Sequence, residues 1–276
     1  MNFICLFFLF VLYYMRGENM KKAFFFDIDG TLLIHKDNII PENTIKELQR
    51  LKKLGYDLFI ASGRPTAFVS KRIKDLDFTG YILCNGAHVE INHQLIDEKP
   101  LPYDDVKALI TFLDGIDCEY NFETATNCYI DEKFKRLHHF FLSCDINFQQ
   151  LLTIFDQEEV MHRTLKIEIG TSQGEEVENY IRDRFCYDSH GTQDSFEIFS
   201  SQVSKASGIQ KAIEYLGIPL ENCYAFGDGL NDMEMIQYVG HGIAMGNSCQ
   251  KLKDVADEVI GAIDEDGLAN YLKTID

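Results

Sequence analysis

The chain has 276 residues, of which 46% are hydrophobic and 25% are charged. This composition supplies enough apolar surface for one large or two modest packed domains, and it is unlike that of disordered chains. The formal net charge of -18 argues against nucleic acids or anionic membranes as partners, because both need a basic surface. A phosphorylated substrate stays compatible with this charge, because a metal ion and a few cations can reverse the field inside one cleft.

Eight cysteines are spread along the chain, and none forms a C-x-x-C pair. The sequence therefore offers no cysteine-based zinc or redox motif. We expect buried free thiols in a reducing compartment, and hence a cytoplasmic protein.

Residues 3–15 form an unbroken apolar run. A helix of this length at ~1.5 Å per residue would span about 20 Å, which is less than the roughly 30 Å of a hydrocarbon core. The run also lacks the basic start and the small-residue cleavage site of a signal peptide. We expect residues 1–19 to be an extension outside the native fold, with Met20 as the true start, and no stable membrane association. The alternative is a membrane-anchored protein whose domain stays in the cytoplasm.

The next segment predicts alternating strands and helices. Residues 22–26 are an apolar run typical of a buried parallel strand. Residues 41–54 have apolar side chains at helical spacing and are followed by Gly55, a residue type common at helix C-termini. The elements that follow are a strand at 56–61, a helix that ends near Leu76 and a strand at 81–84. This alternation predicts an α/β fold with a doubly wound parallel sheet.

The same alternation returns late in the chain. It predicts a helix at 207–216, a strand at 223–226, a short helix at 233–239 and a strand at 241–245. Between the two halves the pattern is less regular, with strand-like stretches at 88–96, 166–169 and 195–199 and helical ones at 104–113, 148–155 and 174–185. We interpret residues 85–194 as an inserted α+β domain, and residues 20–84 and 195–276 as the α/β core.

Asp27 and Asp29 lie two residues apart on the turn after the first predicted strand. Open α/β sheets bind their ligands at this end of the strands. Two carboxylates here can flank one substrate while Mg²⁺ bridges carboxylate and phosphate oxygens. An Asp-x-Asp pair alone is a weak signal, because surface turns contain it often.

Matching polar groups accompany three other predicted elements of the core. Ser62 offers a hydroxyl and neighbouring backbone N–H groups to a phosphoryl oxygen, and Arg64 lies just beyond it. Asp228 and Asp232 lie on a glycine-flanked turn, which suits a hard cation. Lys205 precedes a helix and can place a positive charge on a phosphate. Together these clusters supply the charges that phosphoryl transfer requires, and core packing does not explain them.

Four motifs in this order resemble those of the haloacid dehalogenase (HAD) superfamily of phosphatases, and in particular its Cof-like hydrolase branch. They are DIDGT (27–31), SGR (62–64), the lysine of VSKASG (Lys205) and GDGLND (227–232). The tail HGIAMGNS…ADEVI…DEDGLANYL is also typical of that branch. The resemblance extends from Lys21 to Lys273.

The resemblance implies a role for each matching residue. Asp27 is expected to attack phosphorus and form an aspartyl-phosphate, and Asp29 to act first as acid and then as base. Mg²⁺ is the expected cofactor, with Asp27, Asp29 (through its backbone carbonyl), Asp228 and Asp232 as the metal-binding residues. Phosphate contacts are expected from Thr31, Ser62, Gly63, Arg64, Lys205 and Asn231. Asn85 is expected either to contact the substrate or to serve as a simple turn residue.

The motif spacing adds an independent expectation. Between Asp29 and Ser62 there is room for one helix and one strand, whereas about half of the chain separates Arg64 from Lys205. A lid must therefore be inserted after the second motif, which in this family corresponds to a C2-type cap. We expect a Mg²⁺-dependent phosphatase of small phosphorylated metabolites, above all sugar phosphates, whose cap excludes water and selects the substrate.

Two other functions stay open at this point. A phosphotransferase would pass the phosphoryl group to a second sugar, and a non-catalytic protein would keep the fold for regulation or binding. The intact Asp27, Asp29, Lys205 and Asp228 weigh against the second of these. The physiological substrate and the oligomeric state do not follow from the sequence.

Overall fold

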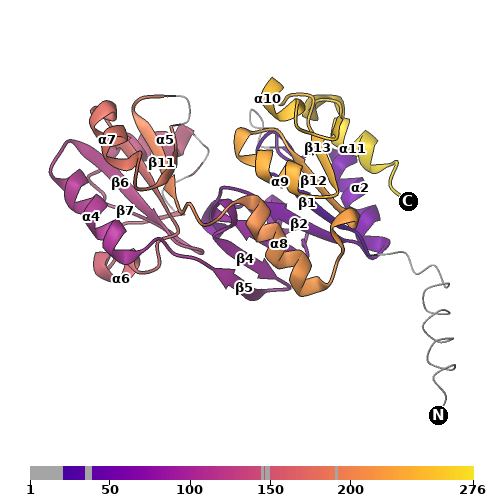
Figure 1. Ribbon diagram of the computed structural model, residues 1–276, viewed down its shortest axis with the longest axis horizontal. Coiled ribbons are helices and arrows are strands. Elements are labelled where there is room, and N and C mark those ends of the chain that lie inside the picture. The colour runs from indigo at the N-terminus through magenta and orange to yellow at the C-terminus, as the bar shows by residue number, and fades with distance from the viewer. Residues whose placement is uncertain (1–20, 35–38, 144–145, 147–149, 190–191) are drawn as a thin grey trace, which may run out of the picture.

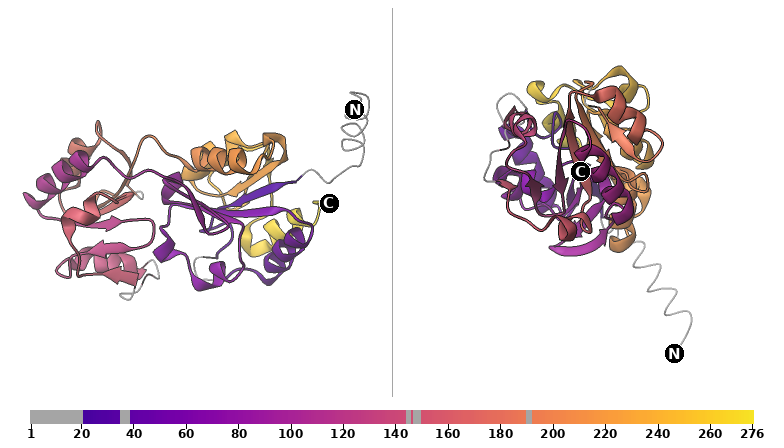
Figure 2. Two further views of the ribbon diagram at one scale, coloured as in Figure 1. Left: turned by 90° about the horizontal axis from the view of Figure 1, so that it is seen from below. Right: turned by 90° about the vertical axis from the view of Figure 1, so that its left-hand side faces the viewer.

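The computed structural model describes residues 21–34, 39–143, 146, 150–189 and 192–276, so the predicted extension at 1–19 lies outside the described residues. The described chain forms two lobes, each built around its own β-sheet (Figure 1). The lobes lie end to end along the long axis of the molecule (Figure 2). None of the helices in these ranges is long and apolar enough to cross a membrane.

The core lobe contains an eight-stranded sheet in the order β14-β13-β12-β1-β2-β3-β4-β5. The strands from β14 to β3 are parallel, whereas β4 and β5 are antiparallel. The strand bounds are β1 (Ala23–Phe26), β2 (Asp57–Ala61), β3 (Gly80–Leu83), β4 (His88–Ile91), β5 (Gln94–Glu98), β12 (Cys223–Gly227), β13 (His241–Ala244) and β14 (Glu258–Val259).

Helices cover both faces of this sheet, which is why β1 is completely buried. One face carries α2 (Glu42–Lys53), α3 (Lys71–Lys74) and α11 (Gly267–Leu272), and the other carries α8 (Lys205–Leu216), α9 (Met233–Tyr238) and α10 (Gln250–Lys253). Side chains of β1 alternate between the layers, so Phe24 and Phe26 join the first cluster and Phe25 the second. The predicted doubly wound α/β core is confirmed.

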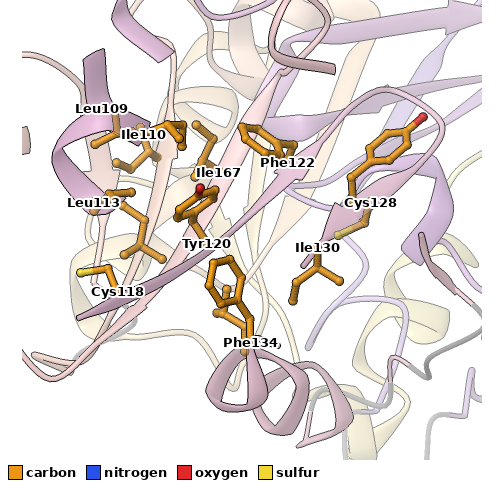
Figure 3. Packing of buried hydrophobic residues seen from close by; sticks show 14 of the residues in the cluster. Leu109, Ile110, Leu113, Cys118, Tyr120, Phe122, Cys128, Ile130, Phe134 and Ile167 are labelled. Carbon is orange, nitrogen blue, oxygen red and sulfur yellow. The ribbon is translucent and has the colours of Figure 1, made fainter. Parts of the chain in front are cut away.

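The cap lobe contains a six-stranded, mostly antiparallel sheet in the order β10-β11-β9-β6-β7-β8. Its strands are β6 (Cys118–Glu123), β7 (Cys128–Ile130), β8 (Leu151–Leu152), β9 (Lys166–Thr171), β10 (Cys186–Asp188) and β11 (Ser195–Phe199), and its helices are α4 (Tyr103–Asp114), α5 (Lys135–Ser143), α6 (Gln157–Met161) and α7 (Gly174–Ile181). Apolar side chains of the sheet and of the helices form one hydrophobic cluster, in which Leu109 and Leu113 of α4 approach Tyr120 and Ile167 of the sheet (Figure 3).

The chain crosses between the lobes at positions that differ from the expected limits at 85 and 194. The alternating stretch at 88–96 is a hairpin, with Asn92 and His93 at positive φ in its turn, and it extends the core sheet next to β3. Strand β11 pairs with β9 and therefore belongs to the cap sheet. The crossings follow Glu98 and Phe199. An alternating pattern shows that a strand is half-buried, but it does not show which of two sheets the strand joins.

Two predicted helices differ from the structure. In the expected helix at 148–155, the described residues Leu151–Leu152 are instead a strand paired with β7, because tertiary pairing overrides local helical spacing. The helix that ends near Leu76 is reduced to α3 and a preceding 3₁₀ turn, η1 (Thr66–Phe68). Phe68 of this turn is buried in the hydrophobic cluster of the cap lobe, so the segment bends away from a continuous helix.

Candidate active site

Most of the predicted site residues follow three neighbouring strands of the core sheet, while Lys205 begins α8 and Asn85 follows β3. Phe26 of β1 lies opposite Ile60 of β2 and Phe226 of β12. The turns that carry Asp27, Ser62 and Asp228 therefore start at the same edge of the sheet. The sheet register thus brings together motifs that are far apart in the sequence.

Lys205 is the centre of a buried ion cluster. Its Nζ lies 2.7 Å from Asp27 Oδ1 and 2.6 Å from Asp232 Oδ1. A capping box between Ser204 and Ser207 fixes the start of α8 and with it the lysine. Burial alone lowers the pKa of an ammonium group, but Asp232 and Asp27 outweigh it and raise the pKa of Lys205. The lysine is therefore positively charged at neutral pH.

Asp27 is almost completely buried, with 6% of its surface exposed. Burial raises the pKa of its carboxyl to about 8, Lys205 opposes this rise and the charge of Asp232 adds to it. A divalent cation beside Asp27 would favour the carboxylate, since it stabilises negative charge. A metal ion bound beside Asp27 would therefore hold its side chain in the ionised form.

Asp232 organises the loop after β12. Its Oδ2 accepts hydrogen bonds from the backbone N–H groups of Asp228 and Gly229, both at 2.9 Å, while its Oδ1 accepts from Lys205. Both oxygens are therefore engaged within the protein. Of the two predicted aspartates on this loop, Asp232 is the one that holds the loop and the lysine in place.

Asp228 faces the turn after β1. Its Oδ1 accepts from the Thr31 hydroxyl at 3.1 Å, so Thr31 contacts the expected metal site. Gly30 has a φ of 82°, and a Cβ at this position would lie 2.2 Å from Asp228 Oδ2. A side chain at Gly30 would collide with this carboxylate, and the backbone conformation is also one that favours glycine.

Carboxylate oxygens of Asp27, Asp228 and Asp232 lie within 4.8 Å of one another. Hard oxygen donors of this kind suit Mg²⁺. The residues therefore fit a magnesium ion. Asp232 is completely buried and holds Lys205 and two backbone N–H groups, so Asp27 and the partly exposed Asp228 are the carboxylates best placed to bind the ion directly.

The side chain of Asp29 lies apart from this three-carboxylate cluster and pairs with Arg64. Arg64 Nε donates to Asp29 Oδ2 at 2.7 Å and Arg64 Nη2 to Asp29 Oδ1 at 2.6 Å, a bidentate ion pair. Arg64 Nη1 donates to the Phe68 carbonyl at 2.9 Å. Arg64, which was expected to contact phosphate, thus orients the expected acid–base residue in this structure.

The remaining predicted residues have distinct surroundings. Ser62 is buried and its Oγ accepts from the Arg64 backbone N–H at 3.2 Å. The Gly63 carbonyl and the Asn85 amide both contact charged residues of the cap lobe. Asn231 is exposed, and its amide oxygen lies over Gly229.

Asn247 was missed at the sequence level. Its Nδ2 donates to the Gly30 carbonyl at 2.9 Å and to Asp228 Oδ2 at 3.4 Å, and its Oδ1 accepts from the Ile263 N–H. It therefore ties the turn after β1 to the turn after β12. The available signal was its position just beyond the strand predicted at 241–245.

A family model of the haloacid dehalogenase-like hydrolases matches residues 24–272, a range that includes every residue of the site described above. Among curated proteins, Bacillus subtilis (strain 168) YkrA is 33% identical over 272 residues, which cover 92% of this chain and 98% of YkrA. The 5-amino-6-(5-phospho-D-ribitylamino)uracil phosphatase YitU of the same organism is 32% identical over 267 residues, covering 90% of this chain and 94% of YitU.

Solved structures agree with this match. A protein from Geobacillus kaustophilus HTA426 superposes with a TM-score of 0.83 at 31% identity, covering 92% of this chain and 98% of the other. The HAD subclass IIB sugar phosphatase BT4131 superposes with a TM-score of 0.78 at 28% identity, with the same coverage. The likeness therefore includes both lobes.

Proposed function

Because the chain belongs to the haloacid dehalogenase-like hydrolase family, we propose that it is a Mg²⁺-dependent phosphatase that hydrolyses small phosphorylated metabolites, above all sugar phosphates, in the cytoplasm. One observation carries the proposal. The Lys205 ammonium lies between Asp27 and Asp232 at the strand ends, with the Asp228 carboxylate beside them. This arrangement supplies a nucleophile, a cation and a set of metal donors within one small volume.

Asp27 is the proposed nucleophile. One of its carboxylate oxygens attacks phosphorus, the bond from phosphorus to the leaving oxygen breaks, and that oxygen takes a proton from Asp29. The phosphoryl group is then an aspartyl-phosphate. A water molecule attacks the same phosphorus and gives a proton to Asp29, and the bond to Asp27 breaks. Inorganic phosphate leaves and both carboxylates return to their starting states.

The surrounding residues position these groups and balance their charge. Lys205 holds Asp27 in place and offsets negative charge on the transferring oxygens. Mg²⁺, when held by Asp27 and Asp228, would neutralise further charge on the phosphoryl group. Arg64 holds both oxygens of Asp29. To act as the acid in the first step, Asp29 must release at least one of these two bonds and take up a proton from solvent, and the proton that it receives from water in the second step restores this state.

The relatives support the substrate class. BT4131 is a sugar phosphatase, and the substrate named for YitU carries its phosphate on a ribityl chain. In both cases the phosphate ester is on a polyhydroxylated carbon chain. We propose the same class for this chain, with the cap lobe as the C2-type cap that covers the leaving group.

The purified protein should release inorganic phosphate from members of a panel of sugar phosphates, phosphorylated polyols and nucleotides when Mg²⁺ is present. EDTA should abolish the release, and added Mg²⁺ should restore it. Mass spectrometry of the products separates hydrolysis from transfer, because a phosphotransferase would phosphorylate an added sugar. A protein that binds Mg²⁺ but releases phosphate from no ester, p-nitrophenyl phosphate included, would contradict the proposal.

A further inference from the structure

The cap lobe contains a second buried lysine that the proposed reaction does not use. Lys166, the first residue of β9, has a side chain that is 7% exposed. Its Nζ lies 3.0 Å from Glu123 Oε2, at the end of β6, and 3.0 Å from Glu197 Oε2, in β11. Glu123 and Glu197 are themselves 1% and 14% exposed. Burial alone lowers the pKa of Lys166, but the glutamates outweigh it and raise the pKa, so the residue is charged.

The third contact of Lys166 crosses to the core lobe. Its Nζ donates to the backbone carbonyl of Gly63 at 3.2 Å. Lys166 thus donates one hydrogen bond to Glu197 Oε2 within the cap lobe and one to this carbonyl, while Glu123 Oε2 is its ion-pair partner. Gly63 lies between Ser62 and Arg64, the two side chains of the SGR motif. The lysine therefore holds the peptide that connects them.

Glu197 makes a parallel link to the core lobe. Its Oε1 accepts from Asn85 Nδ2 at 2.8 Å, and the Asn85 side chain in turn lies over Gly63. The Asn85 N–H donates to the Ser62 carbonyl at 3.1 Å. Side chains of the cap lobe thus fix the segment after β2 both directly and through Asn85.

The far end of the same segment is also held by the cap lobe. The Thr66 N–H donates to the Ala125 carbonyl at 3.0 Å, and Phe68 packs on Phe141 within the cap cluster. Arg64, near the start of this segment, donates to the Phe68 carbonyl at its far end and also to the Asp29 carboxylate. The position of Asp29 therefore depends on a segment that the cap lobe anchors at both ends.

Stability alone is a weak reason for such an ion cluster. Replacing a buried ion group by well-packed apolar residues is often neutral or stabilising. An apolar side chain at position 166 could not donate a hydrogen bond to the Gly63 carbonyl. The feature that requires a lysine, or a comparable donor, is this contact with the SGR segment.

We propose that Lys166, held by Glu123 and Glu197, is a positioning residue through which the cap lobe fixes Ser62 and Arg64 of the phosphate site. It acts through Gly63 and touches neither phosphate nor the reacting atoms. In the absence of this contact the segment 62–68 samples other conformations, and Arg64 orients Asp29 less often. This inference rests on the proposed phosphatase function for its kinetic consequence, but its structural consequence is independent of it.

The test uses the full-length protein with the double substitution Lys166→Met/Glu123→Gln. Methionine removes the donor, and glutamine avoids leaving a second buried charge without a partner, so that the fold is retained. Hydrogen exchange of amides in 62–68 should become about 10-fold faster, because the anchor at Gly63 is lost, while exchange in α4 stays unchanged. For p-nitrophenyl phosphate, kcat should fall about 10-fold or more with a smaller change in KM, since misplacement of a positioning group weakens the transition state most.

Lys107→Met is the matched control, because Lys107 is an exposed lysine of the cap lobe that pairs with Glu158. It should change neither measurement. If the double variant does not fold, Lys166→Leu/Glu123→Gln makes the same test, since leucine also has no hydrogen to donate to the Gly63 carbonyl. A folded variant with unchanged exchange in 62–68 and unchanged kcat would overturn the proposal. Faster exchange in a protein whose wild type hydrolyses no ester would support the positioning role and contradict only the phosphatase function.

Discussion

Two buried lysines of this protein each lie between two carboxylates, and their different roles follow from what surrounds these triads. Lys205 joins Asp27 to Asp232, and Lys166 joins Glu123 to Glu197. In both triads burial opposes the lysine charge and the carboxylates restore it. The local electrostatics of the two lysines are therefore nearly the same.

The difference lies in the next contacts of each triad. Asp27 lies at the strand ends beside the carboxylates of Asp228 and Asp232, a set of oxygen donors that suits a metal ion. Lys166 instead donates a hydrogen bond to the backbone carbonyl of Gly63, at a place where the two lobes meet. A buried lysine between two carboxylates is thus no sign of a reacting site by itself. The triad for which we propose a reaction is distinguished by its place at the strand ends and by a further metal donor, Asp228.

Asp27→Asn should reduce the phosphatase activity more than any change in the Lys166 triad, because it removes the proposed nucleophile. Hydrolysis of p-nitrophenyl phosphate should fall by more than about 1,000-fold, because an amide oxygen is not an effective nucleophile. The thermal midpoint should change little, since asparagine keeps the shape of the side chain and Lys205 keeps Asp232. The equivalent change in the other triad, Glu123→Gln, should cost far less activity. Full activity in Asp27→Asn protein would show that Asp27 is not the nucleophile.

Lys205→Met tests whether the triad of Lys205, Asp27 and Asp232 also stabilises the fold. Removing the lysine leaves Asp232 buried without a counter-charge and raises the pKa of Asp27 further, which together should lower the free energy of unfolding by about 3–5 kcal/mol. Urea denaturation followed by circular dichroism measures this change. Adding Asp232→Asn to the variant should recover part of the loss. An unchanged denaturation midpoint in Lys205→Met protein would mean that the triad is not charged as described.

Magnesium should distinguish the two triads by its effect on stability. At a free concentration about 100 times its dissociation constant, Mg²⁺ should stabilise the wild type by about 2.7 kcal/mol. Asp228→Asn should remove most of this stabilisation, whereas Lys166→Met/Glu123→Gln should retain it, since the cap cluster holds no metal in the proposal. Thermal unfolding across a Mg²⁺ titration makes the comparison. A Mg²⁺ effect that survives Asp228→Asn would place the ion elsewhere.

The smallest expected effect concerns the pH dependence of the cap cluster. Burial raises the pKa of Glu123 above its ordinary value of 4.5, so the folded state binds this proton more tightly than the unfolded state does. The contribution of Glu123 to stability is therefore present at low pH and is lost as the pH rises through the raised pKa. Glu123→Gln should match the wild type below pH 4.5 and be slightly more stable, by less than about 1 kcal/mol, at neutral pH. A stability difference that does not change with pH would contradict this, and exposed Glu132→Gln is the control.

The core lobe could be predicted largely from the sequence, and the cap lobe only in outline. Residues 22–26 and 223–226 are apolar runs that end in polar turns, and buried parallel strands have few other patterns. In the cap lobe, by contrast, Leu151 and Leu152 become a strand only because β7 lies beside them. Such a tertiary preference is not encoded in the spacing of the local side chains.

The candidate site shows the same division. Asp27, Lys205, Asp228 and Asp232 were found because each accompanies a recognisable turn or helix start. Lys166 stands in the strand-like stretch TLKIEIG, where a charged residue is typical of the solvent-facing side. In the structure this side chain contacts Gly63 of the core lobe. The contact depends on how the two lobes pack against each other, and the sequence around Lys166 and around Gly63 gives no local signal for that packing.

Phe68 has a consequence for how substrate preference can change among relatives of this protein. The residue belongs to the core chain, yet its ring fills part of the cap cluster. If the cap lobe alone were moved to another member of the family, Phe68 would stay behind with the core. The transplanted cap would then contain a cavity where the phenylalanine ring had packed, which would lower its free energy of unfolding by about 3–5 kcal/mol. The unit to transplant is therefore larger than the inserted lobe and includes η1, and a hybrid joined at the lobe boundary is expected to be less stable than one in which η1 is exchanged together with the cap.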